Sequence, residues 1–237
     1  MDRNSNTYTL IFSSILVILV ALVLAFVSQF TKIRFETNQT NEKMQNILSS
    51  IGVDIERDQA AKVFKDYIKQ SLTLNADGSI NESVKAFDVD LHKETKKDPS
   101  KQLYPLYIAE KDGKKFYVVP LYGAGLWDAI WGYIALDSDK NTVEGTTFDH
   151  KGETPGLGAQ ITEKWFQAQF HGKTILKDTI AGFNEDNFVS VKTVKGGARS
   201  DDNHGVDAIS GGTKTSDGVN AMIAERLSHY LIYFQKN

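Results

Sequence analysis

A long apolar segment near the N-terminus dominates the hydrophobic pattern. Residues 10–30 contain no charged side chain. Their polar interruptions are Ser13, Ser14, Ser28 and Gln29. At about 1.5 Å per helical residue the segment reaches roughly 31 Å, which is enough to cross the hydrocarbon core of a bilayer. The pattern predicts one transmembrane anchor over residues 10–31, preceded by a short segment of residues 1–9.

A cleaved signal peptide is the alternative to an anchor. The apolar run is longer than the usual hydrophobic region of a signal peptide, and Ala25-Phe26-Val27 places a bulky Val where cleavage needs a small residue. We therefore expect the segment to be retained. The flanking charges, Lys32, Arg34 and Lys43 after it against Arg3 before it, weakly favour a cytoplasmic domain, but long domains translocate largely regardless of such biases.

Helical periodicity continues beyond the anchor. Thr40 or Asn41 can cap a short helix that Gly52 ends. Its apolar positions are Met44, Ile47, Leu48 and Ile51. Asp58 can cap a second helix, with Ala61, Phe64 and Ile68 on one face. These helices predict a helical linker region over residues 32–75.

Strand patterns occupy the middle of the chain. The strands expected in two hairpins are Leu103–Ala109 with Lys115–Leu121, and Ile130–Leu136 with Thr142–Phe148. Asp112-Gly113 is a strong turn pair for the first hairpin. A helix over Ile161–Phe170 and a strand over Asn187–Val194 follow.

A last amphipathic helix closes the chain, and Thr215 or Ser216 can cap it. Its apolar stripe is Val219, Met222, Ile223, Leu227, Tyr230, Leu231 and Phe234. Hairpins between helical ends predict an α+β fold, a hairpin-rich sheet flanked by helices. We expect one domain over residues 32–237, with its core in residues 76–237.

Composition excludes some functions. The formal net charge is −3, and no basic stripe points to nucleic acid. The chain has no cysteine, and its five histidines lack the spacing of metal ligands. They are His92, His150, His171, His204 and His229. We expect no metal site and no catalytic triad, although His150 lies close enough in sequence to line a site near Glu153.

The seven residues from Asp207 to Thr213 carry the most informative chemistry, because they place a hydroxyl on a glycine turn before a helix. The unpaired N–H groups of that helix and the unhindered backbone of Gly211 and Gly212 favour an anion beside Thr213. An ordinary capping turn is the alternative on spacing alone.

Two central segments are also candidates for a binding site. Gly123 and Gly125 let backbone approach a flat ligand, and Leu126 and Trp127 supply an aliphatic and an aromatic wall. A loop whose Trp127 fills the core is an equally good interpretation. The segment from His150 to Gly158 has the composition of a turn-rich loop.

These motifs carry a resemblance. Residues 207–213 resemble the Asp-x-x-Ser/Thr-Gly-Ala-Thr signature on which a flavin transferase attaches FMN, with Gly212 in place of Ala. That replacement removes a methyl and should loosen the turn. Further motifs are Gly125-Leu126-Trp127, Trp131-Gly132-Tyr133 and Gly152-Glu153-Thr154-Pro155-Gly156-Leu157-Gly158. In this order and spacing they resemble the NqrC family, which are components of sodium-translocating NADH:quinone oxidoreductases.

The resemblance implies that Thr213 carries FMN covalently through a phosphoester. The other cofactor-binding residues it implies are Ser210, Gly211, Gly212, Thr215, Leu126, Trp127, Glu153, Thr154, Gly156, Leu157 and Gly158. The flavin would relay electrons inside a membrane complex, so the implied partners are the other subunits, membrane lipid and, during maturation, a flavin transferase. The implied location is the bacterial inner membrane, with one span and the flavin domain on the extracytoplasmic side.

Two alternatives stay open. One is a protein similar to the G component of the Rnf electron-transport complex, which shares the anchor and the threonine-linked FMN. The other is a membrane-anchored, non-redox binding domain that has lost its flavin. No G-x-G-x-x-G fingerprint follows a predicted strand, so we expect no NADH site in this chain.

Overall fold

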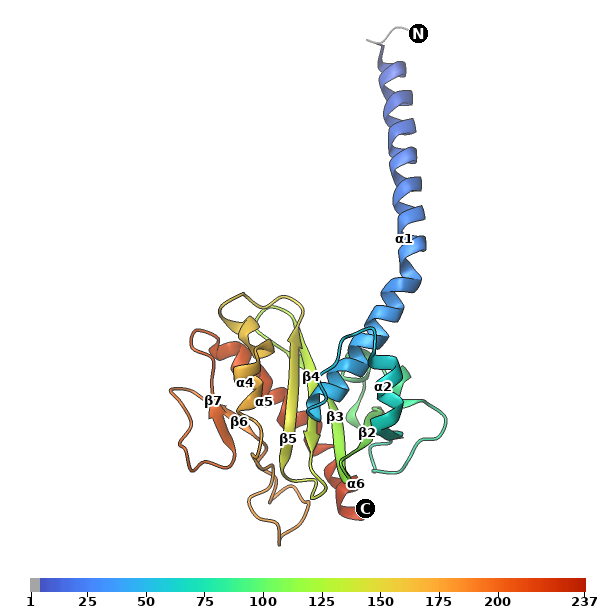
Figure 1. Ribbon diagram of the computed structural model, residues 1–237. Helices are drawn as coiled ribbons and strands as arrows, with labels where there is room; N and C mark the ends of the chain where they lie inside the picture. Colours follow the sequence, from blue (N-terminus) through green and yellow to red (C-terminus); the bar gives the residue numbers. More distant parts are fainter. Residues whose placement is uncertain (1–4) are drawn as a thin grey trace. The chain divides into compact units, whose positions relative to one another are not determined.

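The computed structural model describes residues 5–237 (Figure 1). Contacts divide the chain into two units, with the boundary between Lys43 and Met44. Helix α1 (Asn6–Ser50) is one helix where the sequence pattern predicted two. The cap expected at Thr40 is wrong, because the Thr40 hydroxyl donates to the Glu36 carbonyl inside the helix. Gly52, with φ of +71°, follows the end of α1 as expected.

Among residues 5–237, α1 is the one helix long and apolar enough to cross a bilayer. Its large apolar side chains between Leu10 and Phe35 are exposed rather than packed. A helix that is apolar all round needs an apolar surrounding. This supports single-pass membrane anchoring. Residues 1–4 of the expected N-terminal segment lie outside the described part of the chain.

The second unit is built on one antiparallel sheet of five strands in the order β1-β2-β3-β4-β5. The strands are β1 (Ile68–Leu74), β2 (Tyr104–Lys111), β3 (Lys114–Ala124), β4 (Ala129–Leu136) and β5 (Val143–His150). Both predicted hairpins are confirmed. Asp112 and Gly113, with φ of +53° and +75°, make the β2–β3 turn and pair Lys111 with Lys114.

Both faces of this sheet are covered, which explains why the central strands β2, β3 and β4 contain long apolar runs. Leu106 and Ile108 of β2 enter one core, whereas Tyr107 and Ala109 enter another. The first core also contains α5 (Thr213–Ser228) and α6 (Leu231–Lys236). The second contains the C-terminal end of α1 and α2 (Ala60–Tyr67). The sheet is therefore the middle of three layers (Figure 1).

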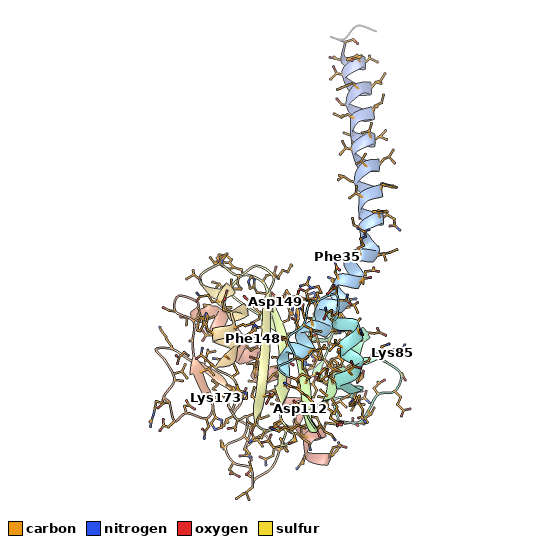
Figure 2. The ribbon with its side chains drawn as sticks, in the orientation of Figure 1. Phe35, Lys85, Asp112, Phe148, Asp149 and Lys173 are labelled. Carbon is orange, nitrogen blue, oxygen red and sulfur yellow. The ribbon has the colours of Figure 1, made fainter. Side chains whose placement is uncertain are left out.

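Aromatic side chains close the first core near β5. Phe148, labelled in Figure 2, packs against Phe166 and Phe170, with ring centroids 6.0 Å and 5.2 Å away. Phe166 lies on α4 (Lys164–Ala168). These contacts hold α4 and the loop before it against the strand that leads to the glycine-rich segment after His150.

Short elements complete the unit. They are η1 (Ala86–Asp88), α3 (Leu91–Glu94), η2 (Pro99–Lys101), η3 (Gly158–Thr162), β6 (Lys192–Val194) and β7 (Gly205–Asp207). Strands β6 and β7 pair in parallel as a separate small sheet. Strand β7 ends where the glycine turn before α5 begins. This small sheet therefore positions the turn next to the first core.

Several predicted elements are wrong in detail. Ile68 was expected on a helix, but it opens β1, a strand that the hydrophobic pattern did not predict. The expected helix over Ile161–Phe170 is split into η3 and α4, because Glu163 is extended between them. The last helix is two helices, since α5 ends at Ser228 and α6 begins at Leu231.

The strand expected over Asn187–Val194 is reduced to β6. Ser190 has φ of +61°, which breaks an extended strand. The Asn187 side chain donates to the carbonyls of Asp178 and Gly182 and so holds a loop. Local side-chain hydrogen bonds therefore outweigh the apolar pattern here.

Candidate functional site

The glycine turn places Thr213 at the start of helix α5. Gly211 has φ of +74°, a conformation that favours glycine, and Gly212 is the N-cap of α5 with φ of −108°. Helix α5 begins at Thr213, two residues before the first predicted cap. The caps expected at Thr215 and Ser216 are therefore wrong. Ser216 instead accepts a hydrogen bond from the Ile209 N–H at 3.1 Å, inside the turn.

The hydroxyls around the turn differ in accessibility. Thr213 is half-buried, Ser210 is exposed, and Thr215 is only 1% exposed. Because Thr213 is the first residue of a 16-residue helix, its side chain lies beside unpaired N–H groups and the positive end of the helix dipole. That position suits a phosphate group.

The turn is tighter than its composition predicts. A Cβ on Gly212 would lie 2.8 Å from Cγ2 of Ile209, so the Ile209 side chain fills the room that an alanine methyl would need. The expectation that Gly212 loosens the turn is therefore wrong. Here the compact packing comes from Ile209, which is buried.

A cavity of about 130 Å³ adjoins Thr213. Its lining comes from three segments that are far apart in sequence: Leu126, Glu153, Thr154, Leu157, Gly158, Gly211, Gly212, Thr213, Lys214 and Thr215. Nine of these ten were expected from the sequence, and Lys214 was missed, although it follows Thr213 directly. Three expected residues, Ser210, Trp127 and Gly156, do not line this cavity.

The apolar residues of the site lie at the surface. Leu126 and Leu157 are exposed, and Trp127 is 69% exposed. The alternative in which Trp127 fills the core is therefore wrong. Its Nε1 donates to Oγ1 of Thr154 at 3.2 Å, which joins the loop after β3 to the loop after β5. Exposed apolar side chains that gather beside a cavity are typical of a binding site.

Glu153 lines the cavity and is buried, with 4% exposure. Its Oε1 accepts the Trp127 N–H at 3.0 Å, and its Oε2 accepts the Thr215 hydroxyl at 2.6 Å. Burial raises the pKa of Glu153, but hydrogen bonds from Thr215 and from the N–H groups of Trp127, Asp128 and Leu126 outweigh burial and hold the pKa below its ordinary value. The carboxylate is therefore ionised at neutral pH.

Two glycines make room for this carboxylate. A Cβ on Gly125 would collide with Oε1 of Glu153, and a Cβ on Gly158 would collide with its Oε2 and with Oγ1 of Thr215. Gly125 was expected to let backbone approach a flat ligand, whereas in the structure it leaves room for the Glu153 carboxylate. His150 lies behind Glu153, where its Nδ1 accepts the Glu153 N–H at 3.2 Å.

Two further cavities adjoin the site. One, of about 610 Å³, contains Leu126 and Trp127 together with His92 and Tyr122. The other, of about 430 Å³, contains Ser210, Gly211 and Thr213 together with Lys195, Gly196, Gly197, Asp207, Ala208 and Ile209. Thr213 thus lines both the 130 Å³ cavity and the 430 Å³ cavity.

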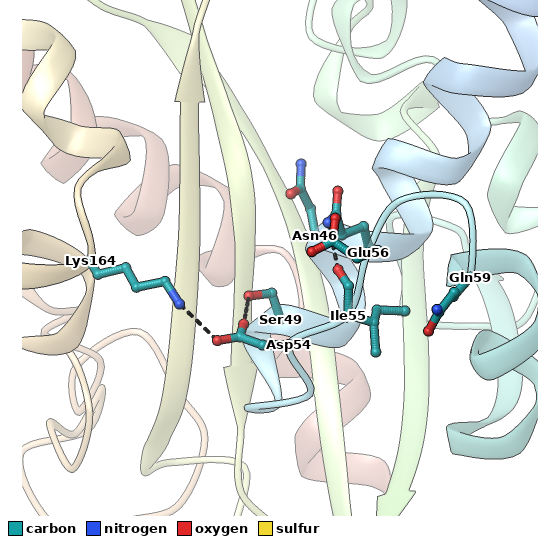
Figure 3. Close-up of a pocket in the computed structure, with 8 residues that line it drawn as sticks. Asn46, Ser49, Asp54, Ile55, Glu56, Gln59 and Lys164 are labelled. Atoms are coloured by element: carbon teal, nitrogen blue, oxygen red, sulfur yellow. Dashed lines mark hydrogen bonds and ion pairs between the residues drawn. The ribbon is translucent and has the colours of Figure 1, made fainter.

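The volume of a cavity alone does not identify the functional site. A cavity of about 610 Å³ elsewhere contains Gln45, Asn46, Ser49, Asp54, Ile55, Glu56, Gln59 and Lys164 (Figure 3). Asp54 is held there by the Lys164 ammonium and the Ser49 hydroxyl, each at 2.8 Å, and these hydrogen bonds lower the pKa of Asp54. This polar cleft contains none of the residues expected to bind a cofactor.

Comparison with known proteins identifies the family. A family model described as an FMN-binding domain matches residues 125–228, which span the cavity lining from the Gly125 loop to α5. The C subunit of the Na+-translocating NADH-quinone reductase of Haemophilus ducreyi is 30% identical over 92% of this chain and 88% of its own length. The C subunit from Vibrio vulnificus is 30% identical over 78% and 76%. The chain belongs to the NqrC family of Na+-translocating NADH-quinone reductases.

Solved structures of the NqrC family confirm the α+β fold. The C subunit from Parabacteroides distasonis is 40% identical, covers 84% of this chain and 94% of its own, and superimposes with a TM-score of 0.75. NqrC from Shewanella oneidensis is 27% identical, covers 83% and 96%, and has a TM-score of 0.70. The family resemblance inferred from the motifs is confirmed, and FMN is supported as the cofactor.

The residues around Thr213 fit FMN. Pockets that enclose drug-sized ligands measure about 300–1,000 Å³, so a cavity of about 130 Å³ suits only the phosphate end of the cofactor. The helix N-terminus and the glycine turn match a phosphate. The exposed Leu126, Trp127 and Leu157 match a flat, largely apolar ring.

Proposed function

We propose that this chain is the electron-relay subunit of a sodium-pumping NADH:quinone oxidoreductase and carries FMN on Thr213 through a phosphoester. One observation carries the proposal. The Thr213 hydroxyl lies at the first position of α5, directly after the Gly211–Gly212 turn and beside a cavity with an apolar rim. The NqrC relatives named above belong to such reductases.

When bound, FMN supplies reversible electron transfer, and the protein supplies position and surroundings. The N–H groups at the start of α5 would bind phosphate oxygens, since they have no partner within the helix. Gly211 lets backbone come close to that phosphate. Leu126 and Leu157 would exclude water from the cofactor. Thr213 would be an attachment point and would take no part in turnover.

The geometry favours Thr213 over the two neighbouring hydroxyls. Thr215 is buried and its hydroxyl donates to Glu153, so a transferase cannot reach it without breaking the site. Ser210 is exposed, but it lies before the turn and outside the 130 Å³ cavity.

Peptide mass mapping tests the attachment. The full chain is produced in cells that supply the flavin transferase, alongside Thr213→Ala and the control Ser210→Ala. We expect the FMN mass increment on the Thr213 peptide of the parent and of Ser210→Ala, and its complete loss in Thr213→Ala. Covalent flavin that persists in Thr213→Ala would refute the assignment.

We further propose that α1 is a retained single span in the bacterial inner membrane and that the flavin domain lies on the extracytoplasmic side. The other subunits of the reductase, membrane lipid and the flavin transferase are the proposed partners. Protease added to intact spheroplasts should digest the domain. Protection until the membrane is broken would reverse the orientation.

The two alternative functions have less support. The relatives compared above are NqrC proteins, which favours the sodium-translocating complex over an Rnf component. A domain without flavin would leave the exposed Leu126, Trp127 and Leu157 without a ligand to cover them. Fluorescence of the protein band in a denaturing gel distinguishes this last case, because covalent flavin stays with the band.

A further inference from the structure

We infer that Glu153 is the positioning residue of the flavin site and that its carboxylate charge lowers the reduction potential of the bound flavin. The inference rests on the proposed function and deepens it. The sequence resemblance placed Glu153 among residues that bind the cofactor directly. The structure gives it a different role, because both of its carboxylate oxygens are already engaged by the protein.

The carboxylate joins the three segments of the site. Through Oε1 it holds the Trp127 N–H of the loop after β3, and through Oε2 it holds the Thr215 hydroxyl in the first turn of α5. Its own backbone belongs to the loop after β5, which also supplies Leu157. The arrangement of Leu126, Leu157 and Thr213 relative to one another therefore depends on these two hydrogen bonds of Glu153.

Two glycines leave room for the Glu153 carboxylate. Gly125 and Gly158 are the positions where a side chain would strike the carboxylate, and both lie in the motifs that carry the family resemblance. An alanine at either position would displace Glu153 or the loop. One buried carboxylate thus accounts for two glycines of the motifs and for the buried hydroxyl of Thr215.

The charge of Glu153 has no cation to neutralise it among residues 5–237. No salt bridge there includes it, and its partners are neutral N–H and O–H donors. Lys214, which also lines the cavity, pairs with Asp217 on the exposed side of α5 at 3.9 Å. Through Oε1 this charge lies at the Trp127 N–H, in the loop whose Leu126 and Trp127 match the flavin ring. A fixed negative charge in a poorly solvated wall makes the addition of an electron to a nearby group less favourable.

Replacement of Glu153 by Gln tests the charge. Gln can accept from the Trp127 N–H through its oxygen and donate from its amide to the Thr215 hydroxyl, which is free to rotate. The full chain is flavinylated in cells, and its midpoint potential is measured by spectroscopic titration. We expect Glu153→Gln to keep covalent flavin and to shift the potential to a more positive value than in the parent.

Asp128→Asn is the matched control, because it removes a carboxylate from the loop after β3, directly next to the Trp127 N–H that Glu153 accepts. Asp128 is half-exposed and pairs with Lys151 at 2.9 Å, so solvent and that lysine screen its charge. We expect a much smaller shift for this variant. Equal potentials in the parent and Glu153→Gln would overturn the inference, as would equal shifts in the two variants.

Thr215→Val provides a second test that keeps the carboxylate, and it decides the matter if Glu153→Gln takes up no flavin. Loss of the Thr215 donor raises the pKa of Glu153. The other titratable groups nearby, His150, Lys214 and the Asp128–Lys151 pair, remain in place. As the pH falls through the raised pKa, Glu153 becomes neutral in the variant first. Its potential should then become increasingly more positive than that of the parent.

A potential difference between Thr215→Val and the parent that stays at zero at every pH would overturn the inference. These results are separable from a failure of the proposed function. If the parent carries no covalent flavin although the transferase is present, the proposed function fails before any potential is measured.

Discussion

The two ends of α5 each hold a buried charge, and they use it differently. At the N-terminal end, Glu153 accepts the Thr215 hydroxyl, and at the C-terminal end Arg226 is 1% exposed. Each sign suits its end of the helix dipole, negative near the N-terminus and positive near the C-terminus. Their surroundings differ, since Glu153 borders a cavity and Arg226 is enclosed by protein.

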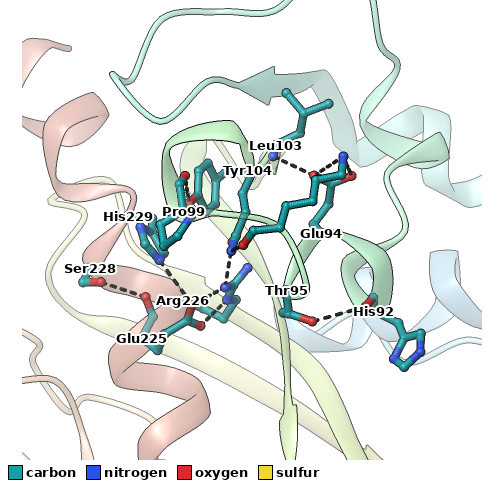
Figure 4. Close-up of polar contacts among 12 residues, drawn as sticks. His92, Glu94, Thr95, Pro99, Leu103, Tyr104, Glu225, Arg226, Ser228 and His229 are labelled. Atoms are coloured by element: carbon teal, nitrogen blue, oxygen red, sulfur yellow. Dashed lines mark hydrogen bonds and ion pairs between the residues drawn. The ribbon is translucent and has the colours of Figure 1, made fainter.

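The Arg226 end is a network of side chains (Figure 4). Its guanidinium donates hydrogen bonds to the Glu225 carboxylate and, at 3.1 Å, to Oε1 of Gln102. The guanidinium carbon lies 5.8 Å from the ring centre of Tyr104. His229 stacks on Tyr104 and approaches the Glu225 carboxylate at 3.2 Å. Every partner belongs to α5, to its C-terminal flank or to the segment that enters β2, so this charge joins helix to sheet.

The comparison teaches how to separate a functional buried charge from a structural one. Arg226 is paired with an opposite charge and covered by an aromatic ring, as a structural ion is. Glu153 is held only by neutral donors, next to open space and exposed apolar residues. We expect loss of Arg226 to affect stability and loss of the Glu153 charge to affect the flavin.

The largest expected effect is that of Arg226→Ala. The change leaves a cavity and strands the Gln102 amide oxygen, whereas the half-exposed Glu225 carboxylate stays solvated, so we expect a loss of about 2–4 kcal/mol in the free energy of unfolding. Urea or thermal unfolding of the full chain measures it. The flavin content of the folded fraction should match that of the parent.

Arg199→Ala is the matched control, because Arg199 makes an exposed ion pair with Asp201 at 2.7 Å. It should change the free energy of unfolding by about 1 kcal/mol or less. Arg226→Met, which keeps most of the side-chain volume, should recover part of the loss. A loss in Arg226→Ala no larger than in Arg199→Ala would contradict the structural role of this end.

The smallest effect on stability is expected for Trp127→Ala at the other end. Trp127 is exposed and packs little, so the free energy of unfolding should change by only about 0.5 kcal/mol. The emission of the covalent flavin should rise, because an indole in contact with a flavin quenches it by electron transfer. Fluorescence of the flavinylated chain measures the change.

Trp165→Ala is the control for this prediction, since Trp165 is also exposed but lies on α4, outside the three cavities that surround Thr213. Its flavin emission should equal that of the parent. If both tryptophan variants change the emission equally, Trp127 does not form a wall of the flavin site.

Local patterns were enough to predict much of the fold and most of the site. Asp112-Gly113 predicted the first hairpin, because a tight hairpin turn needs positive φ at both central positions and few residue pairs tolerate that conformation. The hydroxyl after two glycines predicted the Thr213 turn. Strand β1 was missed because Ile68 also fits a helical stripe. Strand β7 and its pairing with β6 were missed because a three-residue strand has almost no periodicity.

The sequence by itself determined the apolar anchor segment, the glycine turn before Thr213 and the family motifs, because each depends on residues close together in the chain. Only the tertiary structure decided what Glu153 does. Its partners lie in the loop before β4 and at the start of α5, and no local pattern reports a hydrogen bond between segments so far apart. Burial, which depends on packing of the whole domain, likewise decided that Trp127 faces solvent while Thr215 does not.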